Sequence, residues 1–377
     1  MPTETILRVP YNYLPMQLAE GTALARDIER DIVEELHRGL FTLGPWVERF
    51  EQAICDKYSV RHCIGVNSGT DALVLSLKAM GVGQGDLVLT VANSFIATAG
   101  AIVAAGASPR FVDVGLDYFM DLTEAGHRCA KAIIPVHLTG LAQETSLAAF
   151  TVNDACQAIG AEYDGKSVAK FNQISAFSLH PLKNLHVLGD GGFVTTDDDS
   201  YAAEVRLLRN HGLQDRDHCV MPGANSRLDS LHAIAAWHGL KTLDDNNDIR
   251  RWNAALYDSG LAGLEPDVTV PWRDPRAKPV YHTYVVMVER RNVLQAYLAE
   301  KGIETRVHYP IPIHLQEGYR WLGYKRGDLP QTEHQADHII SLPVHEYLSD
   351  DQVEYVIERV RAFYQDEDEG GHVTEPA

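Results

Sequence analysis

The chain has 377 residues, of which 45% are hydrophobic and 23% are charged, and its formal net charge is −19. This length predicts one large or two medium domains, and the composition is ordinary for a globular protein. A charge of this sign repels nucleic acid and anionic membrane surfaces, so neither is expected as a general partner. The sequence has no run near the roughly 18 apolar residues of a membrane span.

The start of the chain and its cysteines favour a cytoplasmic protein. The first residues, MPTETILRVP, lack the basic and then apolar segments of a secretion signal. The cysteines are odd in number, scattered, and outside CxxC pairs: Cys55, Cys63, Cys129, Cys156 and Cys219. This pattern favours reduced thiols over a disulfide framework or a zinc site, and we expect no metal site.

Residues 1–25 are rich in aromatic and turn residues, so we interpret them as an arm rather than a domain. Apolar residues at helical spacing predict a helix over residues 26–40, and Pro45 suits the first turn of the next helix. Apolar runs without polar alternation then predict buried parallel strands over residues 63–66, 87–91, 110–114, 131–136 and 150–152, and further apolar runs predict strands at residues 174–179 and 193–196.

Helical segments alternate with these strands. They are predicted over residues 72–80, 97–105, 201–208, 231–240 and 250–261. Strands that alternate with helices indicate an α/β fold with a mostly parallel sheet. We therefore predict a large domain over residues 26–250.

The pattern changes near residue 265. Residues 280–288 alternate as a half-exposed strand does, residues 291–301 and 350–363 predict helices, and residues 305–309 and 339–343 are extended. These elements predict a smaller α+β domain over residues 251–364. Residues 365–377 are acidic and contain glycine, so we expect a disordered tail.

Residues that can bind a ligand or take part in catalysis follow several of the predicted strands. Gly69 and Thr70 begin a helix, whose free N–H groups and dipole suit a phosphate. Phe95, Asp154 and Lys183 also lie just beyond strand ends. In open α/β sheets this edge binds ligands, so we expect these side chains to share one site.

Each of these residues has an ordinary explanation when taken alone. Loop lysines are usually solvated, and a serine, threonine or aspartate at a helix start is usually a cap. As a set they fit pyridoxal phosphate. Lys183 can form a Schiff base with it, Asp154 can hold the protonated ring nitrogen, Phe95 can cover the ring, and Gly69 and Thr70 can bind the phosphate.

The motifs NSGTDAL, KAIIPVHLTG, DACQAIGAEYDG, FSLHPLKNLHVLGDGG, RNHG, GANSRLD and GIETRVHYPIPIH occur in this order. Together they resemble the DegT/StrS family of pyridoxal-phosphate-dependent sugar aminotransferases, over about residues 11–363. The resemblance implies the aspartate-aminotransferase type I fold and a homodimer with active sites at the subunit interface. It implies transfer of an amino group from L-glutamate or glutamine to a keto or aldehyde sugar, usually nucleotide-linked, in amino-sugar biosynthesis.

The resemblance also implies roles for individual residues. Lys183 is expected as the Schiff-base lysine and proton carrier, Asp154 as the partner of the pyridinium, and Gln157 as the hydrogen-bond donor to the phenolic oxygen. Phe95 stands at the position of the family's stacking aromatic residue.

The phosphate and substrate positions follow from the same motifs. Gly69, Thr70 and Ser178 are expected to bind the phosphate, and Asn225 to reach the phosphate of the partner subunit. The residues expected near the sugar are His180, His308, Tyr309 and His314. The sequence GDGG after the lysine and the motif NSRLD favour members that act at carbon 3.

Other readings of the sequence remain open at this stage. Related sugar dehydratases carry histidine in place of the lysine, so Lys183 argues against that chemistry. A regulatory or ligand-binding homologue would not need the Lys183–Asp154 pair, and the net charge argues against DNA binding. An amino-acid aminotransferase needs an arginine for the α-carboxylate, and Arg227 or Arg306 can supply one.

Overall fold

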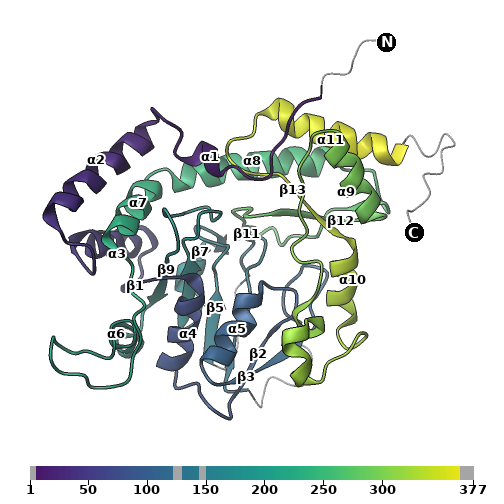
Figure 1. Ribbon diagram of the computed structural model, residues 1–377. Coiled ribbons are helices and arrows are strands. Elements are labelled where there is room, and N and C mark those ends of the chain that lie inside the picture. Colours follow the sequence, from purple (N-terminus) through teal and green to yellow (C-terminus); the bar gives the residue numbers. More distant parts are fainter. Residues whose placement is uncertain (1–5, 122–129, 144–149, 366–377) are drawn as a thin grey trace.

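The computed structural model describes residues 6–121, 130–143 and 150–365. A large central sheet is covered by helices, and further helices and a second sheet lie at one end of it (Figure 1). The tail predicted over residues 365–377 lies outside the described part except for its first residue, so its disorder stays a prediction.

The large sheet has the strand order β1-β9-β8-β5-β4-β2-β3. Its strands are β1 (His62–Val66), β2 (Leu87–Val91), β3 (Ser108–Val112), β4 (Ala132–Ile133), β5 (Phe150–Asp154), β8 (Ile174–Ser178) and β9 (Gly192–Thr196). β9 is antiparallel to both β1 and β8, and the other neighbours are parallel. The predicted α/β fold with a mostly parallel sheet is therefore confirmed.

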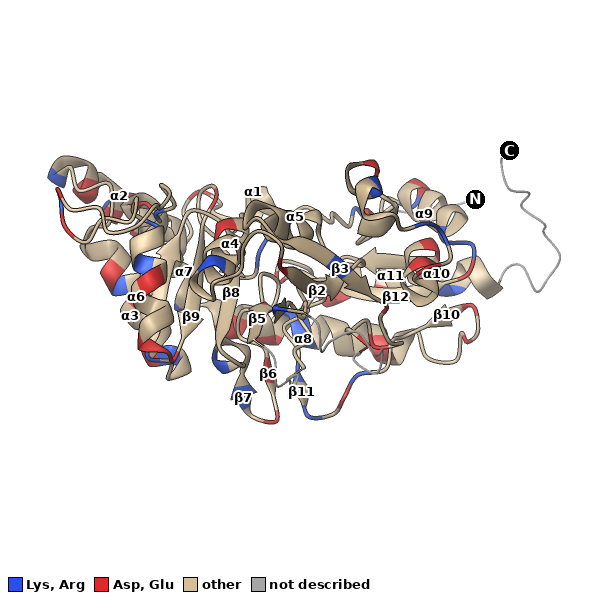
Figure 2. Cartoon of the chain, turned by 90° about the horizontal axis from the view of Figure 1, so that it is seen from below, with Lys and Arg blue, Asp and Glu red and all other residues tan. Residues whose placement is uncertain are grey.

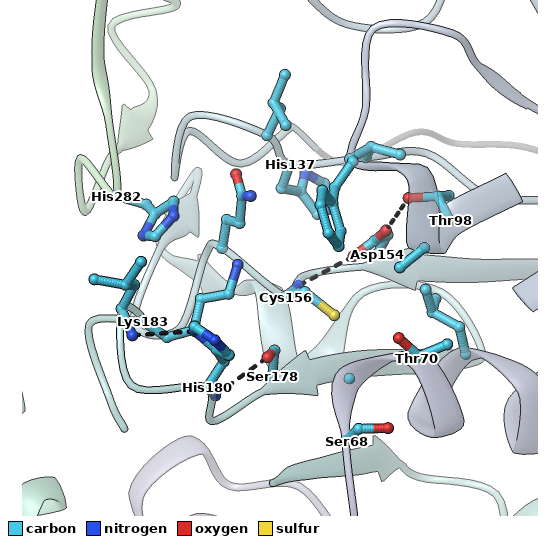
Figure 3. Close-up of a pocket in the computed structure, with 18 of the residues that line it drawn as sticks. Ser68, Thr70, Thr98, His137, Asp154, Cys156, Ser178, His180, Lys183 and His282 are labelled. Atoms are coloured by element: carbon cyan, nitrogen blue, oxygen red, sulfur yellow. Dashed lines mark hydrogen bonds between the residues drawn. The ribbon is translucent and has the colours of Figure 1, made fainter. Parts of the chain in front are cut away.

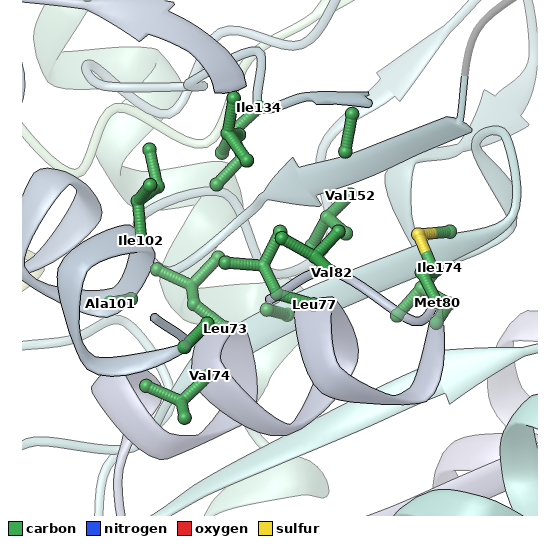
Figure 4. Packing of buried hydrophobic residues seen from close by; sticks show 14 of the residues in the cluster. Leu73, Val74, Leu77, Met80, Val82, Ala101, Ile102, Ile134, Val152 and Ile174 are labelled. Atoms are coloured by element: carbon green, nitrogen blue, oxygen red, sulfur yellow. The ribbon is translucent and has the colours of Figure 1, made fainter. Parts of the chain in front are cut away.

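Helices cover both faces of this sheet. α4 (Gly69–Ala79), α5 (Ile96–Ala104) and α6 (Asp199–Leu208) pack on one face through the cluster in Figure 4, where Leu73 and Leu77 meet Val152 and Ile174. The second face is covered by α3 (Pro45–Tyr58) and α7 (Ser230–Leu240), and α2 (Ala23–Arg38) packs against α7. Successive strand residues point to opposite faces, so β9 gives Phe193 to one cluster and Val194 to the other.

Two helices begin earlier than their apolar pattern predicts. α4 begins at Gly69 because the Ser68 hydroxyl accepts a hydrogen bond from the N–H of Asp71 at 3.1 Å. α2 begins at Ala23 because Thr22 caps the N–H of Ala25 in the same way. The first turn of a helix is fixed by such caps and needs few apolar residues.

A second, antiparallel sheet has the order β10-β12-β13. It consists of β10 (Val268–Thr269), β12 (Tyr284–Val288) and β13 (Ile339–Leu342). The helices around it are α8 (Leu243–Gly260), α9 (Arg291–Glu300), α10 (Pro330–His338) and α11 (Asp350–Gln365). α8, α9 and α11 enclose a separate apolar cluster with this sheet.

The strand predicted over residues 305–309 is wrong. Arg306 makes a single antiparallel bridge to Ser341, and the chain then turns away toward the large sheet. The predicted domain boundary at residue 250 lies inside α8, which is continuous through it. The division into a large and a small domain therefore stays a prediction.

The remaining elements are short. They are α1 (Leu14–Gln17), η2 (Val168–Lys170), η3 (Ile313–Leu315), η4 (Glu317–Leu322) and a small sheet of β6 (Glu162–Tyr163), β7 (Lys166–Ser167) and β11 (Ala277–Lys278). Basic and acidic segments lie beside one another around α2, α3 and α6 (Figure 2). Within the described residues, no helix is both long and apolar enough to cross a bilayer.

Candidate active site

A cavity of about 350 Å³ lies beyond the carboxyl ends of strands β5 and β8. Sequence-predicted residues that line it are Gly69, Thr70, Phe95, Asp154, Gln157, Ser178, His180, Lys183, His308 and Tyr309. They come from segments that are far apart in the sequence and converge because parallel strands end at one edge. The volume is typical of a small-ligand pocket.

One end of the cavity is formed by the start of α4 and the end of β8 (Figure 3). A Cβ atom on Gly69 would lie 2.6 Å from Cβ of Ser178 and 2.9 Å from Sγ of Cys156, so a side chain does not fit there. The first N–H groups of a helix have no partner inside the helix. This end therefore combines backbone donors, the hydroxyls of Thr70 and Ser178, and the positive end of a helix dipole.

Asp154 ends β5 and is 6% exposed. Its Oδ2 accepts a hydrogen bond from Oγ1 of Thr98 at 2.7 Å, and its Oδ1 accepts one from the N–H of Cys156 at 3.2 Å. Sequence reasoning missed Thr98, because a threonine in an apolar helix usually bonds to its own backbone.

Lys183 lies in the turn that follows β8. Its N–H donates to the carbonyl of His180 at 2.8 Å, which closes the turn. Burial lowers the pKa of the Lys183 amine, and the nearby Cys156 and Asp154 partly offset this shift. A lowered pKa increases the share of neutral amine, which is the nucleophilic form.

Besides His137, three histidines line the same cavity: His180, His282 and His308. Burial and the nearby Lys183 lower the pKa of all three, to about 4 for His308. Nδ1 of His308 lies 2.9 Å from the Ser341 hydroxyl. Sequence reasoning missed His282, which enters from the start of the second sheet and carries no local motif.

Two aromatic side chains, Phe95 and Tyr309, meet in the same cavity. The ring centroids of Phe95 and Tyr309 are 5.7 Å apart, and Nε2 of Gln157 donates to the Tyr309 hydroxyl at 3.4 Å. Burial raises the pKa of Tyr309 to about 12, so its hydroxyl stays protonated at neutral pH. Phe95 keeps 52% of its surface exposed at the mouth of the cavity.

Two predicted residues lie elsewhere. His314 is buried outside the described lining of the cavity, and its Nε2 lies 3.0 Å from Oε1 of Glu333, so its contact with substrate stays a prediction that its position does not support. Asn225 is exposed and bridges to Asn210. Arg227 and Arg306 are also absent from the described lining, so neither is placed to hold an α-carboxylate there.

The glycines after the lysine serve packing rather than ligand approach. A Cβ atom on Gly192 would lie 2.5 Å from the backbone of Ser68, and one on Gly191 would meet Val187 and Leu228. Gly192 thus lets β9 approach the residue that caps α4. None of Gly189, Gly191 and Gly192 is among the described lining residues, so they support the cavity through the packing of the elements around it.

The sequence pattern of the DegT/DnrJ/EryC1/StrS aminotransferase family matches residues 23–361. The chain belongs to this family. It is 37% identical to the dTDP-3-amino-3,4,6-trideoxy-alpha-D-glucose transaminase of Streptomyces venezuelae, over 94% of this chain and 96% of that protein. It is also 38% identical to a pleiotropic regulatory protein of Geobacillus stearothermophilus, over 91% and 95% of the two chains.

Solved structures agree with this assignment. DesV of S. venezuelae, in complex with a ketimine intermediate, superposes with a TM-score of 0.90 at 36% identity, over 95% of this chain and 99% of that one. NtdA of Bacillus subtilis, with bound cofactor PMP, gives a TM-score of 0.88 at 28% identity, over 97% and 87%. The aspartate-aminotransferase type I fold is thereby confirmed, and the chain is a pyridoxal-phosphate-dependent aminotransferase.

The cavity fits this cofactor on its own chemistry. It offers backbone donors and hydroxyls beside Gly69, where no side chain fits, and these suit a phosphate. It offers a buried carboxylate, Asp154, for a protonated ring nitrogen and the amine of Lys183, whose pKa is lowered by desolvation, for an aldehyde. When bound, pyridoxal phosphate supplies an electron sink that stabilises negative charge on the substrate carbon.

Proposed function

We propose that this enzyme transfers an amino group from L-glutamate or L-glutamine to the keto or aldehyde group of a sugar in amino-sugar biosynthesis. The proposal extends to a nucleotide-linked sugar, and carbon 3 is favoured as the carbon that receives the amino group. The observation that carries it is the convergence of Lys183, Asp154 and the start of α4 on one cavity, in a chain whose relatives are named sugar transaminases. The motifs GDGG and NSRLD support carbon 3.

Lys183 has two proposed tasks. Its Nζ would hold the cofactor and, after the amino donor displaces it, would move a proton at the substrate carbon. Its lowered pKa supports both tasks, because the amine has to lose and regain a proton near neutral pH.

The other cofactor contacts follow the geometry of the cavity. Asp154 would hold the ring nitrogen, with Thr98 fixing the carboxylate, and Gln157 would bond the phenolic oxygen. Phe95 would cover the ring. The phosphate would be held by Gly69, Thr70 and Ser178.

The sugar would lie among His180, His308 and Tyr309, joined by His282. Neutral imidazoles both donate and accept hydrogen bonds, which suits sugar hydroxyls. The lowered pKa values of the three histidines support a neutral, polar subsite rather than a cationic one.

We also propose a homodimer whose active sites are shared. Phe95 and Leu182 line the cavity yet stay 52% and 40% exposed, as expected of side chains that a second subunit covers. Asn225 is exposed, which leaves it available to reach the phosphate in the partner subunit. A cytoplasmic location, supported by the free thiols Cys55, Cys63, Cys156 and Cys219, belongs to the same proposal.

Hybrid dimers test the shared site. Lys183→Ala and Asn225→Ala homodimers should each be impaired. When the two variants are mixed and allowed to exchange subunits, one site in each hybrid regains both native side chains, so activity should rise above that of either parent. No rise on exchange, with exchange verified by tagged subunits, would contradict the shared site.

Two half-reactions test the function itself. Purified enzyme loaded with pyridoxal phosphate should lose its visible absorbance on addition of L-glutamate or L-glutamine, and a keto sugar should restore it. A panel of free, phosphorylated and nucleotide-linked 3-keto and 4-keto sugars identifies the acceptor, with Lys183→Ala as the inactive control. If only amino acids and keto acids react, the sugar assignment is wrong. If nothing reacts although the cofactor binds, the regulatory alternative gains support.

A further inference from the structure

Residues 6–17 form a strap that joins the segment after α9 to the lysine turn. Val9 pairs with Ile303 in a parallel bridge, with backbone hydrogen bonds of 2.9 Å to Gly302 and from Glu304. The strap then runs beside α8 to α1 (Figure 1). The strap thereby links the segment after α9 to the lysine turn, although the strap itself supplies no sequence motif for cofactor binding.

The end of the strap donates hydrogen bonds to two backbone carbonyls next to the lysine. The Tyr13 hydroxyl donates to the carbonyl of Leu182 at 3.0 Å, and Nε2 of Gln17 donates to the carbonyl of Pro181 at 2.7 Å. Tyr13 is 5% exposed and Gln17 is 6% exposed. Tyr13 precedes α1 and Gln17 ends it four residues later, so one helical turn brings both donors to the same face.

The Tyr13 hydroxyl is itself held in place by Arg250, which pairs with Glu346. Arg250 of α8 donates from Nη2 to the Tyr13 hydroxyl at 2.9 Å, and the same Nη2 lies 2.6 Å from Oε2 of Glu346. The side chains of Arg250 and Glu346 are 2% and 4% exposed. Burial raises the pKa of Tyr13, so its hydroxyl keeps the proton that it donates to Leu182. A buried chain of charge-assisted hydrogen bonds is stronger and more rigid than a single neutral one.

These contacts act directly on the lysine backbone. The Leu182 carbonyl and the Lys183 N–H belong to one planar peptide unit, so holding the oxygen fixes the orientation of that plane. The same N–H closes the turn on His180 at 2.8 Å. Release of Leu182 would let the peptide rotate, and the direction in which the Lys183 side chain leaves the backbone would change with it.

We propose that Tyr13 and Gln17 are positioning residues that orient the peptide carrying Lys183, which makes the N-terminal strap a working part of the active site. The proposal rests on the proposed role of Lys183 as the residue that holds the cofactor. Arg250 and Glu346 contribute indirectly to the orientation of this peptide, because they fix the Tyr13 hydroxyl.

Tyr13→Phe removes the donor and keeps the ring. The matched control is Tyr364→Phe, since the buried Tyr364 hydroxyl donates to the carbonyl of Glu289 at 2.7 Å, in a residue outside the described cavity lining. In single turnovers with L-glutamate, followed by loss of the visible absorbance, Tyr13→Phe should react about 10- to 100-fold more slowly, because small displacements of a reacting group carry such costs. Its dissociation constant for glutamate should stay close to that of the native enzyme.

Gln17→Met provides a second, independent variant that keeps the length of the side chain. It should slow the same step, and it decides the question if Tyr13→Phe does not fold. The pH midpoint of the visible band in the loaded enzyme should shift in both variants and stay unchanged in Tyr364→Phe. Equal single-turnover rates and equal midpoints in all four proteins would overturn the positioning role. If the native enzyme shows no visible absorbance, or shows one that does not depend on Lys183, the proposed function itself is refuted.

Discussion

Thr98 of α5 donates a hydrogen bond of 2.7 Å to Asp154 at the end of β5, and both side chains are buried. The other carboxylate oxygen of Asp154 accepts the N–H of Cys156. With both oxygens held, the carboxylate cannot rotate freely. A carboxylate fixed in this way is oriented before the ligand arrives, which reduces the entropy that binding has to offset.

Thr98→Val tests this arrangement, because it removes the hydroxyl and keeps the branched shape. A hydrogen bond to a charged group contributes about 1.5–3 kcal/mol, so the dissociation constant for pyridoxal phosphate should rise about 10- to 100-fold. Titration of cofactor-free enzyme measures it. Thr195→Val is the control, since the Thr195 hydroxyl is buried and donates to Ala169 away from the cavity. A control that weakens cofactor binding equally would show that the effect is one of general stability.

The pH dependence of cofactor loading should reflect the environment of Lys183. Burial lowers the pKa of this amine, and only the neutral amine couples to the cofactor aldehyde. The loading rate of cofactor-free enzyme should therefore rise with pH through a midpoint below that of an ordinary lysine, about 10.4.

Asp154→Asn tests the direction in which the charge of Asp154 shifts the pKa of Lys183 in the same titration. The negative charge of Asp154 favours the ammonium form and so raises the pKa of Lys183. Removing that charge should move the loading midpoint to still lower pH. Stopped-flow loading at a series of pH values measures both midpoints, and an upward shift in Asp154→Asn would contradict the proposed coupling.

The cofactor-binding part of the site was predictable because the ends of parallel strands show which residues lie close together. Apolar runs without alternation predict parallel strands, and parallel strands end at one edge, so Gly69, Asp154 and Lys183 could be brought together from their places after such runs. The central sheet followed from the same pattern. The extent of its strands did not, since pairing with neighbours decides where a strand stops.

Other contacts depend on long-range packing and leave no local pattern. Tyr13 and His282 reach the lysine turn from distant parts of the chain, and their neighbours in sequence do not indicate a cavity. His314 shows the converse case, since it lies in a motif near the cavity but its ring contacts Glu333. The direction of a side chain in a loop is set by tertiary partners that the sequence does not identify.

His314 should matter for stability and not for the sugar. Its Nε2 lies against Glu333, whose carboxylate also accepts the N–H of Gly327 at 2.9 Å. His314→Leu leaves a buried carboxylate with one partner fewer and should cost about 1–3 kcal/mol of unfolding free energy. His308→Leu changes the cavity itself and should raise the KM for the acceptor. Urea unfolding and steady-state kinetics on both variants separate the two effects, and a raised acceptor KM in His314→Leu would contradict this assignment.

Gly192 provides the sharpest test of how the sheet supports the cofactor. It lies in register with Ser178 of β8 and Val66 of β1, and a Cβ atom there would lie 2.5 Å from the backbone of Ser68 and 2.7 Å from the carbonyl of Phe177. Backbone atoms cannot rotate away as a side chain can. Gly192→Ala should therefore displace the cap of α4, at a cost of about 1–3 kcal/mol in unfolding free energy.

The same displacement should weaken binding at the start of α4. Gly83→Ala is the matched control, because no atom lies within 4 Å of the Cβ it would add. We expect Gly192→Ala to lower both the urea midpoint and the affinity for pyridoxal phosphate, and Gly83→Ala to change neither. If Gly192→Ala is destabilised but binds the cofactor as tightly as Gly83→Ala does, the cap of α4 is not coupled to the phosphate end of the cavity.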